Sequence, residues 1–360
     1  MATLTEASVI ARKVIKFGAI GFVVITILWY LGIALIKYYQ AINPPPLANP
    51  TTDFGQLPKI NFPESVARPK LILELPTGGI PIFVDRMRIY SAPAKRSSFT
   101  DAEKGIEIAA ALGFLFKPDQ RTESNYIWTN QDQLNSKLDM NIINGHFVLS
   151  RQWQNNPALA SMASFVSDKA VIMDTENYLS RVGLLSSDIL GVEKVTYFKD
   201  DGGRLIGALS LSDADFVRLD LFRRNLDEID PDSKTKVVIA SYPFYRSDPN
   251  KGIVGVIVSG SNNLSDKVIG LEYGYNKIDY VNNGTYPIKT GEEAWSELEK
   301  GGGYVYRGES SLSEVKIRRV FLGYYDADIS TGYVMPIYIF LGDQGFTAYV
   351  SAVNEAWIKK

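Results

Sequence analysis

Cysteine is absent from the 360 residues of the chain, and histidine occurs once, at position 146. Without cysteine the chain cannot form a disulfide, a thiol nucleophile, a thiolate metal site or an iron–sulfur cluster. A single histidine excludes every zinc motif that needs two, and a Ser–His–Asp triad could be built only around His146. The folded part of the chain must therefore be stabilised by packing alone.

Sequence motifs for phosphate binding and acyl transfer are missing as well. The chain contains no G-x-S-x-G, G-x-x-x-x-G-K-[ST] or G-x-G-x-x-G pattern. The run Gly301–Gly303 follows a predicted helix, whereas a phosphate loop opens one. Acidic and basic residues are interspersed and the formal net charge is −2, so no basic stripe favours nucleic acid. We therefore predict no cofactor, no metal ion and no nucleic-acid partner.

A run of twenty residues without a charge, Phe17–Ile36, stands near the N-terminus. At about 1.5 Å per helical residue it spans roughly 30 Å, which is the thickness of the hydrocarbon core of a bilayer. Trp29 and Tyr30 are suited to the membrane interface, where amphipathic rings are enriched. A core helix of a soluble protein rarely lacks a polar face, so the run predicts a membrane-spanning helix.

The charges around this run predict its orientation. Arg12, Lys13 and Lys16 precede it, whereas only Lys37 follows it closely. The positive-inside rule therefore keeps the N-terminus in the cytoplasm and places the rest of the chain outside, in the cell envelope. A cleaved signal peptide is the alternative, but its apolar region is usually about 7–15 residues long. We expect an uncleaved anchor within residues 1–40, in a protein of the cytoplasmic membrane.

Residues 41–69 contain seven prolines, at positions 44, 45, 46, 50, 58, 63 and 69. Proline fixes φ and removes a backbone donor, so this segment should be extended and not helical. Fully stretched, at about 3.1 Å per residue, it could hold the folded body as much as roughly 90 Å from the membrane. Alternatively, Ile60, Phe62 and Val66 pack it along the first domain. The sequence does not decide between these two arrangements.

From Lys70 onward the chain repeats a short capped helix accompanied by antiparallel strands, which predicts an α+β fold of two or three helix-on-sheet units. The predicted units are 70–155, 156–280 and 281–360. Their helices start at Thr100, Ser167 and Thr290, and capping boxes are predicted at Thr100–Glu103 and Thr290–Glu293. The common order of helix and strands resembles an internal repeat.

Strands are predicted where β-branched and aromatic residues gather between turn residues. Asn144 and Gly145 indicate a two-residue type I′ hairpin, and alternation in Phe216–Phe222 predicts a sheet with one solvated face. The predicted strands are Leu71–Leu75, Ile82–Tyr90, Leu138–Ile143, His146–Ser150, Val195–Phe198, Leu205–Leu211, Phe216–Phe222, Val237–Ala240, Ile253–Val258, Val268–Tyr275, Val315–Tyr324, Tyr333–Leu341 and Phe346–Val353.

The last 80 residues or so resemble a known family. The resemblance rests on a predicted helix, Thr290–Trp295 with Leu298, on the segment Gly303–Val305, and on two predicted strand segments, Tyr333–Tyr338 and Phe346–Val350. Together they resemble the C-terminal part of YycH/YycI-type proteins, and they are similar to PepSY-like units. Those proteins are single-pass, extracytoplasmic and bacterial, and some regulate a membrane sensor histidine kinase. The resemblance implies an architecture and a regulatory role, and it names no catalytic residue.

The single histidine and several pairs of neighbouring carboxylates are the residues that could carry chemistry. His146 follows a predicted turn, so we expect an ordinary solvated histidine. Three close carboxylate pairs could suit a glycosidase or an aspartic protease, which need only two such groups. Each pair lies beside small residues between strand-like runs, where aspartate commonly caps a turn, and we expect that role. The pairs are Asp200–Asp201, Asp213 with Asp215, and Asp326 with Asp328.

Two further patterns were considered as binding sites. Glu228, Asp230 and Asp232 alternate like calcium ligands, but the loop lacks the glycine and the distal glutamate of an EF-hand. Tyr324 and Tyr325 are neighbours in a predicted strand, so they should face opposite sides and one could remain exposed. Since tyrosine is a preferred anchor of protein interfaces, these two residues are a candidate interaction surface.

These observations favour a membrane-anchored extracytoplasmic protein that binds, regulates or scaffolds an envelope partner without catalysis. The mechanism would be tethering, because an anchor raises the effective concentration of the body near a membrane partner. Two other classes stay open, an envelope hydrolase that uses a carboxylate pair and a subunit of a cell-surface assembly.

Overall fold

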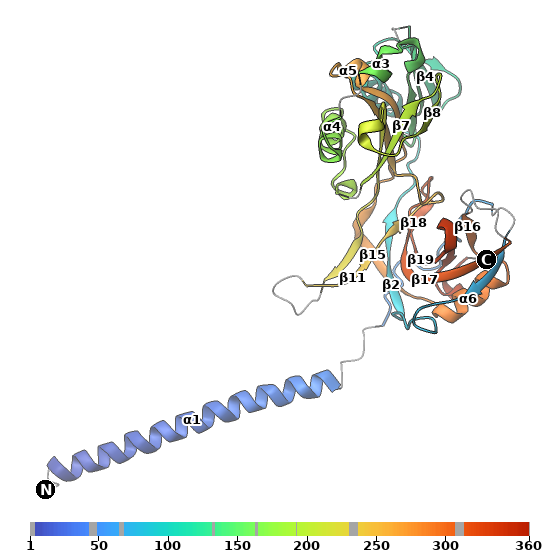
Figure 1. Ribbon diagram of the computed structural model, residues 1–360. Helices are drawn as coiled ribbons and strands as arrows, with labels where there is room; N and C mark the ends of the chain where they lie inside the picture. The colour runs from blue at the N-terminus through green and yellow to red at the C-terminus, as the bar shows by residue number, and fades with distance from the viewer. Residues whose placement is uncertain are drawn as a thin grey trace. The chain divides into compact units, whose positions relative to one another are not determined.

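The computed structural model describes residues 4–42, 49–64, 68–131, 134–162, 165–191, 193–229, 237–306 and 313–359. The chain divides into two compact units, Met1–Asn49 and Pro50–Lys360. The first unit is dominated by α1 (Leu4–Ile42), a helix of 39 residues (Figure 1). The second unit, the body, is α+β and consists mostly of sheet, which confirms the α+β part of the predicted fold class.

Helix α1 confirms the predicted apolar helix. Its segment Ile15–Ile36 is long and apolar enough to cross a membrane, and none of it is buried against the rest of the protein. Phe17, Trp29, Tyr30 and Ile36 are between 59% and 70% exposed. Lys16 is exposed too, whereas the side chains of Arg12 and Lys13 lie outside the described residues.

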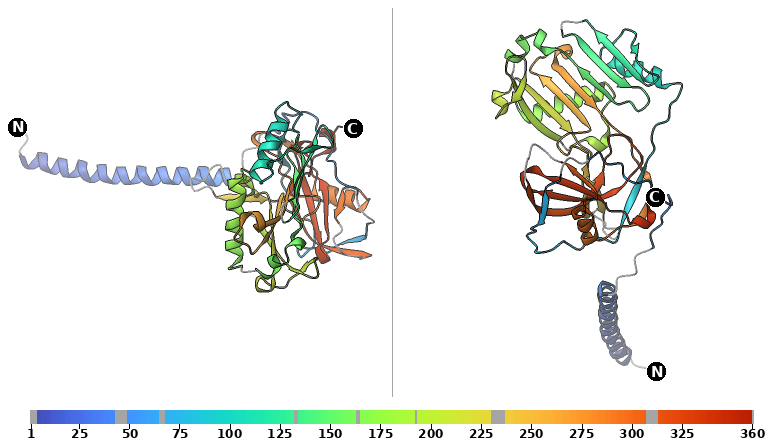
Figure 2. Two further views of the ribbon diagram at one scale, coloured as in Figure 1. Left: turned by 90° about the horizontal axis from the view of Figure 1, so that it is seen from above. Right: turned by 90° about the vertical axis from the view of Figure 1, so that its right-hand side faces the viewer.

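The larger sheet of the body has nine antiparallel strands in the order β3-β4-β5-β6-β14-β13-β9-β7-β8, seen side by side in the right-hand view of Figure 2. Helices α2 (Asp101–Ala111) and α4 (Asp168–Arg181) contribute to the apolar core on one face of it. The strands are β3 (Asp119–Gln120), β4 (Asn125–Asn130), β5 (Ser136–Asn141), β6 (Phe147–Ser150), β7 (Glu193–Asp200), β8 (Leu205–Gly207), β9 (Phe216–Leu221), β13 (Val254–Ser259) and β14 (Val268–Tyr273).

This sheet takes strands from both of the predicted ranges 70–155 and 156–280. The helix-on-sheet units expected in these two ranges therefore do not have separate sheets. The reason is β6, which pairs with β14 over Phe147–Ser150 and so joins the two ranges through backbone hydrogen bonds. A domain boundary at residue 155 stays a prediction.

The second sheet has the order β1-β17-β19-β20-β16, and β12 also pairs with β17. The long strand β17 has β1 parallel to its first part and β12 parallel to its last two residues. Helix α6 (Gly291–Glu299) packs through Ala294 and Leu298 on one face, and a second apolar core covers the other. The strands are β1 (Lys70–Leu73), β12 (Phe244–Tyr245), β16 (Tyr304–Tyr306), β17 (Glu314–Tyr325), β19 (Pro336–Gly342) and β20 (Thr347–Ser351).

Two small sheets complete the body. One has the order β15-β2-β18, and the other is a two-stranded ribbon of β10 and β11. The strand predicted over Tyr333–Leu341 is divided between sheets, because β18 joins the small sheet and β19 the six-stranded one. The strands are β2 (Arg86–Ala92), β10 (Leu226–Ile229), β11 (Val238–Tyr242), β15 (Asp279–Pro287) and β18 (Gly332–Val334). Among the described residues, the remaining elements are the short helices α3 (Ala158–Ser161) and α5 (Leu264–Lys267) and five 3₁₀ turns.

The described part of the proline-rich segment packs against the body. Leu57 is fully buried and forms a parallel bridge with Ile358, and Ile60 is 5% exposed. Phe62 packs in the same core, beside Tyr325 and Tyr349. We call residues 50–62 the strap. The strap packs mostly against residues of the range 281–360, and Ile89 of β2 belongs to the same core. Of the two arrangements that the sequence left open, the described part of the segment takes the packed one. Val66 lies outside the described residues.

Of the three residues predicted to start helices, Thr290 and Ser167 cap their helices and Thr100 does not. Thr290 forms the predicted capping box, accepting a hydrogen bond from the Glu293 backbone N–H while the Glu293 carboxylate accepts from the Thr290 N–H. Ser167 also caps its helix. The capping box at Thr100 is wrong, because Thr100 has helical φ and ψ and its hydroxyl makes no capping bond.

This contrast yields a prediction. We expect Thr290→Ala to lower the free energy of unfolding by about 1 kcal/mol, since it removes a working cap. Thr100→Ala should change it by close to zero. Urea unfolding of both variants measures the difference, and equal effects would contradict the assignment of the caps.

Two predictions about strands were also wrong. The turn at Asn144–Gly145 is a four-residue loop, in which only Gly145 has positive φ and the Asn141 N–H donates to the His146 carbonyl. Strand β9 has no solvated face, because Asp220 is 3% exposed and Arg218 bridges it to Glu272 on β14.

Candidate functional site

A buried arginine, Arg223, lies where the sheets of the body meet. It follows β9 of the nine-stranded sheet, and its side chain is fully buried. Its Nε donates to Asp326 Oδ2 at 3.0 Å, and its Nη1 donates to Asp188. Asp188 belongs to the turn after α4, whereas Asp326 directly follows β17 of the six-stranded sheet. One guanidinium group therefore links the two large sheets.

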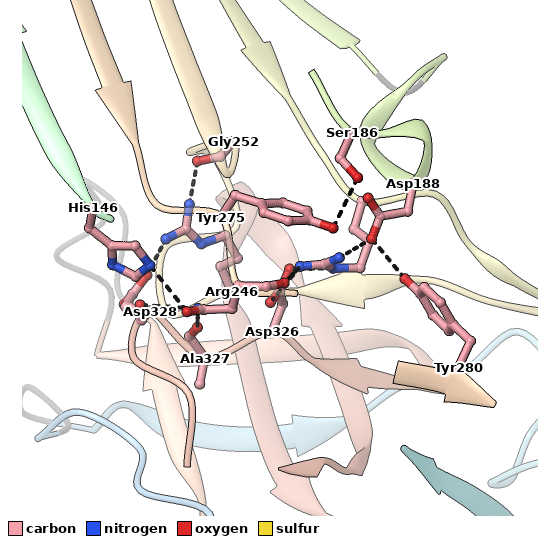
Figure 3. Close-up of polar contacts among 12 residues, drawn as sticks. His146, Ser186, Asp188, Arg246, Gly252, Tyr275, Tyr280, Asp326, Ala327 and Asp328 are labelled. Carbon is pink, nitrogen blue, oxygen red and sulfur yellow. Dashed lines mark hydrogen bonds and ion pairs between the residues drawn. The ribbon is translucent and has the colours of Figure 1, made fainter. Parts of the chain in front are cut away.

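Further contacts hold the guanidinium group in place. Its Nη2 donates to the Asn276 carbonyl oxygen at 2.8 Å. The rings of Tyr275 and Phe244 lie with their centroids 5.1 and 5.5 Å from the guanidinium carbon, within the range of cation–π attraction. Asp188 also accepts a hydrogen bond from the Tyr280 hydroxyl of β15, at 3.0 Å (Figure 3). All three larger sheets thus contribute to one polar cluster.

The charges of this cluster stabilise one another. Burial alone lowers the pKa of Arg223, but the carboxylates of Asp326 and Asp188 outweigh it and the pKa is raised. Burial raises the pKa of Asp188, but the charge of Arg223 and hydrogen bonds from neighbouring hydroxyls bring it below its usual value. Both carboxylates are therefore ion-pair partners in the folded protein.

The pair Asp326 and Asp328 was expected to cap a turn, and that expectation is wrong. Asp328 binds the guanidinium of Arg246 and the hydroxyl of Ser247, so the two carboxylates serve two different arginines. The pair Asp200–Asp201 does include a turn contact, because Asp200 accepts from the Gly203 N–H at 2.6 Å. In the third pair, Asp215 accepts from the Asp200 N–H at 2.8 Å, across neighbouring strands, and Asp213 pairs with Lys199. For the calcium pattern, Asp230 and Asp232 lie outside the described residues.

His146 is half-buried and not a solvated residue as predicted. Its Nε2 lies 3.1 Å from Asn276 Oδ1, while the Asn276 amide donates to the carbonyl oxygens of Ala327 and Asp328 (Figure 3). Because those carbonyls assign the amide nitrogen as a donor, Oδ1 accepts and His146 Nε2 carries the hydrogen. The histidine therefore joins β6 to the loop after β17 through one asparagine.

The pKa of His146 is lowered from its usual value of 6.5, mainly by burial and also by the charge of Arg246, while the Asn276 bond and Asp328 act in the opposite direction. We expect the imidazole to titrate below pH 6.5 in the folded protein. A lowered pKa means that its contribution to stability is complete above pH 6.5 and is lost as the pH falls through the folded-state pKa.

The chain has a single histidine, so one imidazole C–H resonance followed against pH by NMR measures this value. His146→Gln should remove the titration and the matching part of the pH dependence of unfolding. A midpoint at or above 6.5 would contradict the structure.

Two cavities adjoin the cluster. The first, of about 690 Å³, lies over β5, β6 and β14 and is lined by charged groups that include Arg246, Lys251 and Glu272. The second, of about 1080 Å³, is lined by seven aliphatic and three tyrosine side chains together with eight polar or charged residues, and most of its surface is apolar. Asn141, Tyr273 and Ile329 line both. A large, mostly apolar cavity with a few polar groups is the usual form of a ligand site, so the second cavity is the candidate site.

Tyr324 and Tyr325 are 2% and 5% exposed, so the prediction that one of them is exposed is wrong. They do face opposite sides of β17, but each side has its own apolar core. These residues cannot form a surface for a partner. Neither the Arg223 cluster nor the second cavity was predicted, and Arg223 carries no sequence signal beyond its position at the end of a strand.

Within the part of the chain that the structure describes, no group of three or more His, Asp or Glu residues could hold a metal ion. The arrangement offers ion-paired carboxylates, half-buried hydrogen-bonding groups and an apolar cavity. Such groups can hold and orient a bound molecule.

No family model matches the chain, and no curated protein matches it. The resemblance of the C-terminal part to YycH/YycI-type proteins therefore stays a prediction. Among solved structures, the chain is similar to an uncharacterised protein of Eubacterium rectale, with 13% identity over 79% of this chain and 88% of that chain and a TM-score of 0.39. A similarity at this level carries no argument about fold or function.

Proposed function

We propose that the protein is a single-pass, membrane-anchored binding protein whose body lies outside the cytoplasmic membrane. In this role it regulates or scaffolds an envelope partner without catalysis. The observation that carries the proposal is α1, whose apolar residues Ile15–Ile36 are not buried against any part of the body. Exposed apolar surface of this length is stable in a bilayer and costly in water.

The attachment of the strap supports a tethering role. Only seven residues separate Ile42, the end of α1, from Pro50, where the body begins. At about 3.3–3.6 Å per residue they can span at most roughly 25 Å. An anchored body on so short a connection samples a small volume, so its effective concentration near a membrane partner is high.

The candidate site supports binding as the role of the body. Asp188 and Asp326, the carboxylates of the cluster beside the second cavity, both form ion pairs with Arg223. A carboxylate that serves as a general acid needs a raised pKa, whereas that of Asp188 is lowered. We therefore prefer a binding protein to the alternative of an envelope hydrolase.

The test uses the full chain in intact cells with a membrane-impermeant lysine crosslinker and externally added protease. We expect the body to be digested from outside, and to crosslink to one discrete membrane or envelope protein. A control variant with Arg12, Lys13 and Lys16 all replaced by Glu removes the orienting charges and should lose both results. A body protected from the protease, or accessible but without a discrete crosslink, would refute the proposal. Large symmetric particles on extraction would instead favour an assembly subunit.

A further inference from the structure

The walls of the second cavity are formed by carbon-rich side chains from several elements. Ile108 comes from α2, Ile143 from the loop after β5, and Leu184 from the segment after α4. Ile278 and Tyr280 lie on the opposite side, on the segment that enters β15 and on β15 itself. A ligand in this cavity therefore meets mainly apolar surface.

Two of the three tyrosines that line the cavity have their hydroxyl groups bonded to residues of the Arg223 cluster. The Tyr275 hydroxyl accepts a hydrogen bond from Ser186 at 3.0 Å, and the Tyr280 hydroxyl donates to Asp188 at 3.0 Å (Figure 3). These hydroxyls are held by the cluster around Arg223, so the rings are available to the cavity chiefly through their carbon atoms. Two of the three tyrosines thus present mainly carbon atoms to a ligand.

Two aliphatic side chains among the cavity-lining residues are exposed to solvent. Val281, on the bulge of β15, is 91% exposed, and Ile329, in the loop after β17, is 70% exposed. Single exposed aliphatic residues are common on protein surfaces. Here, however, two of them come from different elements and line the same apolar cavity, so a bound apolar chain would cover both.

The second cavity also has a lysine, Lys277, in its lining. Lys277 is exposed, and within the described ranges no carboxylate lies within ion-pair distance of its ammonium group. The other lysine of the lining, Lys95, pairs with Asp101 at 3.1 Å. Asp279 uses one carboxylate oxygen to accept from the backbone N–H groups of Val281 and Asn282. Lys277 is thus the cation of the lining whose ammonium group is placed to pair with an acidic group of a ligand.

We propose that the second cavity binds an anionic amphiphile, with the aliphatic chain against the isoleucine, leucine and tyrosine walls and the acidic head group at Lys277. The head group is a carboxylate, as in a long-chain fatty acid, or a phosphate, as in a lysophospholipid. This inference rests on the proposed function, since a body tethered to a bilayer is close to a supply of such molecules. Burial of methylene groups would provide most of the affinity and the charge the orientation.

The test uses the full chain in vesicles of a neutral phospholipid, with a palmitate analogue that carries a diazirine near the end of its chain. After photolysis, the labelled peptides are identified by mass spectrometry. We expect label on the peptides that contain Ile278–Val281 and Ile329, in addition to the background on α1. Excess palmitate should compete for the cavity label, and methyl palmitate, which lacks the charge, should compete at least about fivefold more weakly. Competition by lysophosphatidic acid would show that a phosphate head group also fits.

Two variants sharpen the result. Ala94→Trp places a large ring at an exposed lining position and should lower the cavity label at least about fivefold, while Ser97→Trp, on the same loop outside the lining, should not. Lys277→Glu should weaken competition by palmitate at least about fivefold, and Lys300→Glu, on the surface after α6, should leave it unchanged.

The α1 label provides an internal control for delivery of the probe. Label confined to Phe17–Ile36, or cavity label that is unaffected by Ala94→Trp, would overturn the site. Equal competition by methyl palmitate would overturn the acidic head group. A chain that is labelled in the cavity but crosslinks to no envelope protein would refute the proposed partner and not the lipid site.

Discussion

Replacing Arg223 with methionine should lower the free energy of unfolding by about 3–5 kcal/mol. The substitution removes the cation from a site in which its side chain is fully buried and leaves Asp188 and Asp326 without their shared partner. Two buried carboxylates without a counter-charge must be desolvated unpaired or take up protons, and both alternatives destabilise the folded state. Urea unfolding of the full chain in detergent, followed by tryptophan fluorescence, measures the change.

The interpretation can be separated from a simple loss of packing. The triple variant Arg223→Met with Asp188→Asn and Asp326→Asn removes all three charges, so we expect it to recover part of the lost stability. Lys70→Ala breaks the exposed pair with Glu314, whose side chains are 73% and 45% exposed, and should cost less than about 1 kcal/mol. An Arg223→Met variant as stable as Lys70→Ala would contradict the central place of the cluster.

Truncation of Leu57 to alanine should lower the free energy of unfolding by about 2–5 kcal/mol. Leu57 is fully buried between the strap and the C-terminal segment, and its backbone bonds to Trp357 and Lys359 prevent the strap from moving in to fill the space. We also expect faster proteolytic cleavage within the strap, because its apolar contacts hold it against the body. The readouts are urea unfolding and limited proteolysis of the full chain.

The matched control is Leu209→Ala, since Leu209 is 97% exposed and makes the same chemical change at the surface. Its effect should be close to zero. If Leu57→Ala behaved like Leu209→Ala, the strap would be a loosely attached linker and not part of the folded body.

The elements that depend on nearby residues were predicted best from the sequence. Helix α6 was predicted from Thr290 and Glu293, and both make the expected capping bonds. Thr100 is followed by the same pattern but does not cap its helix. Thr100 itself has helical φ and ψ, and the Asp101 carboxylate accepts a hydrogen bond from the Ser98 N–H at this end of the helix. A local motif thus predicts the position at which a helix begins. It is a less secure guide to the capping hydrogen bonds that form there.

Strand pairing could not be predicted, since it joins residues far apart in the chain. The parallel pairing of β1 with β17 connects Lys70 to Glu314, and the strap bridge connects Leu57 to Ile358. The burial of Tyr324 and Tyr325 follows from such pairing. Their alternation was predicted correctly, but a second core on the other face of the sheet is formed largely by distant segments, among them the strap.

The candidate site was missed for the same reason. Arg223, Asp188 and Asp326 come from three separate parts of the chain, and nothing in the sequence around any one of them indicates the others. His146 was expected in solvent because it follows a turn, yet Asn276, 130 residues away in the chain, contacts its ring. When a side chain is buried by an element that is distant in the chain, the neighbouring sequence contains no pattern that predicts the burial.

The strap also determines where a mechanical load would enter the protein. A pull on α1 reaches the body at Pro50 and is resisted first by the hydrogen bonds of Thr51 and Thr52 to Thr285, then by those of Leu57 to Trp357 and Lys359. These contacts lie on β15 and on the C-terminal segment, outside the nine-stranded sheet. In a single-molecule pulling experiment we expect the strap to peel off as a distinct early step, with a lower force in Leu57→Ala.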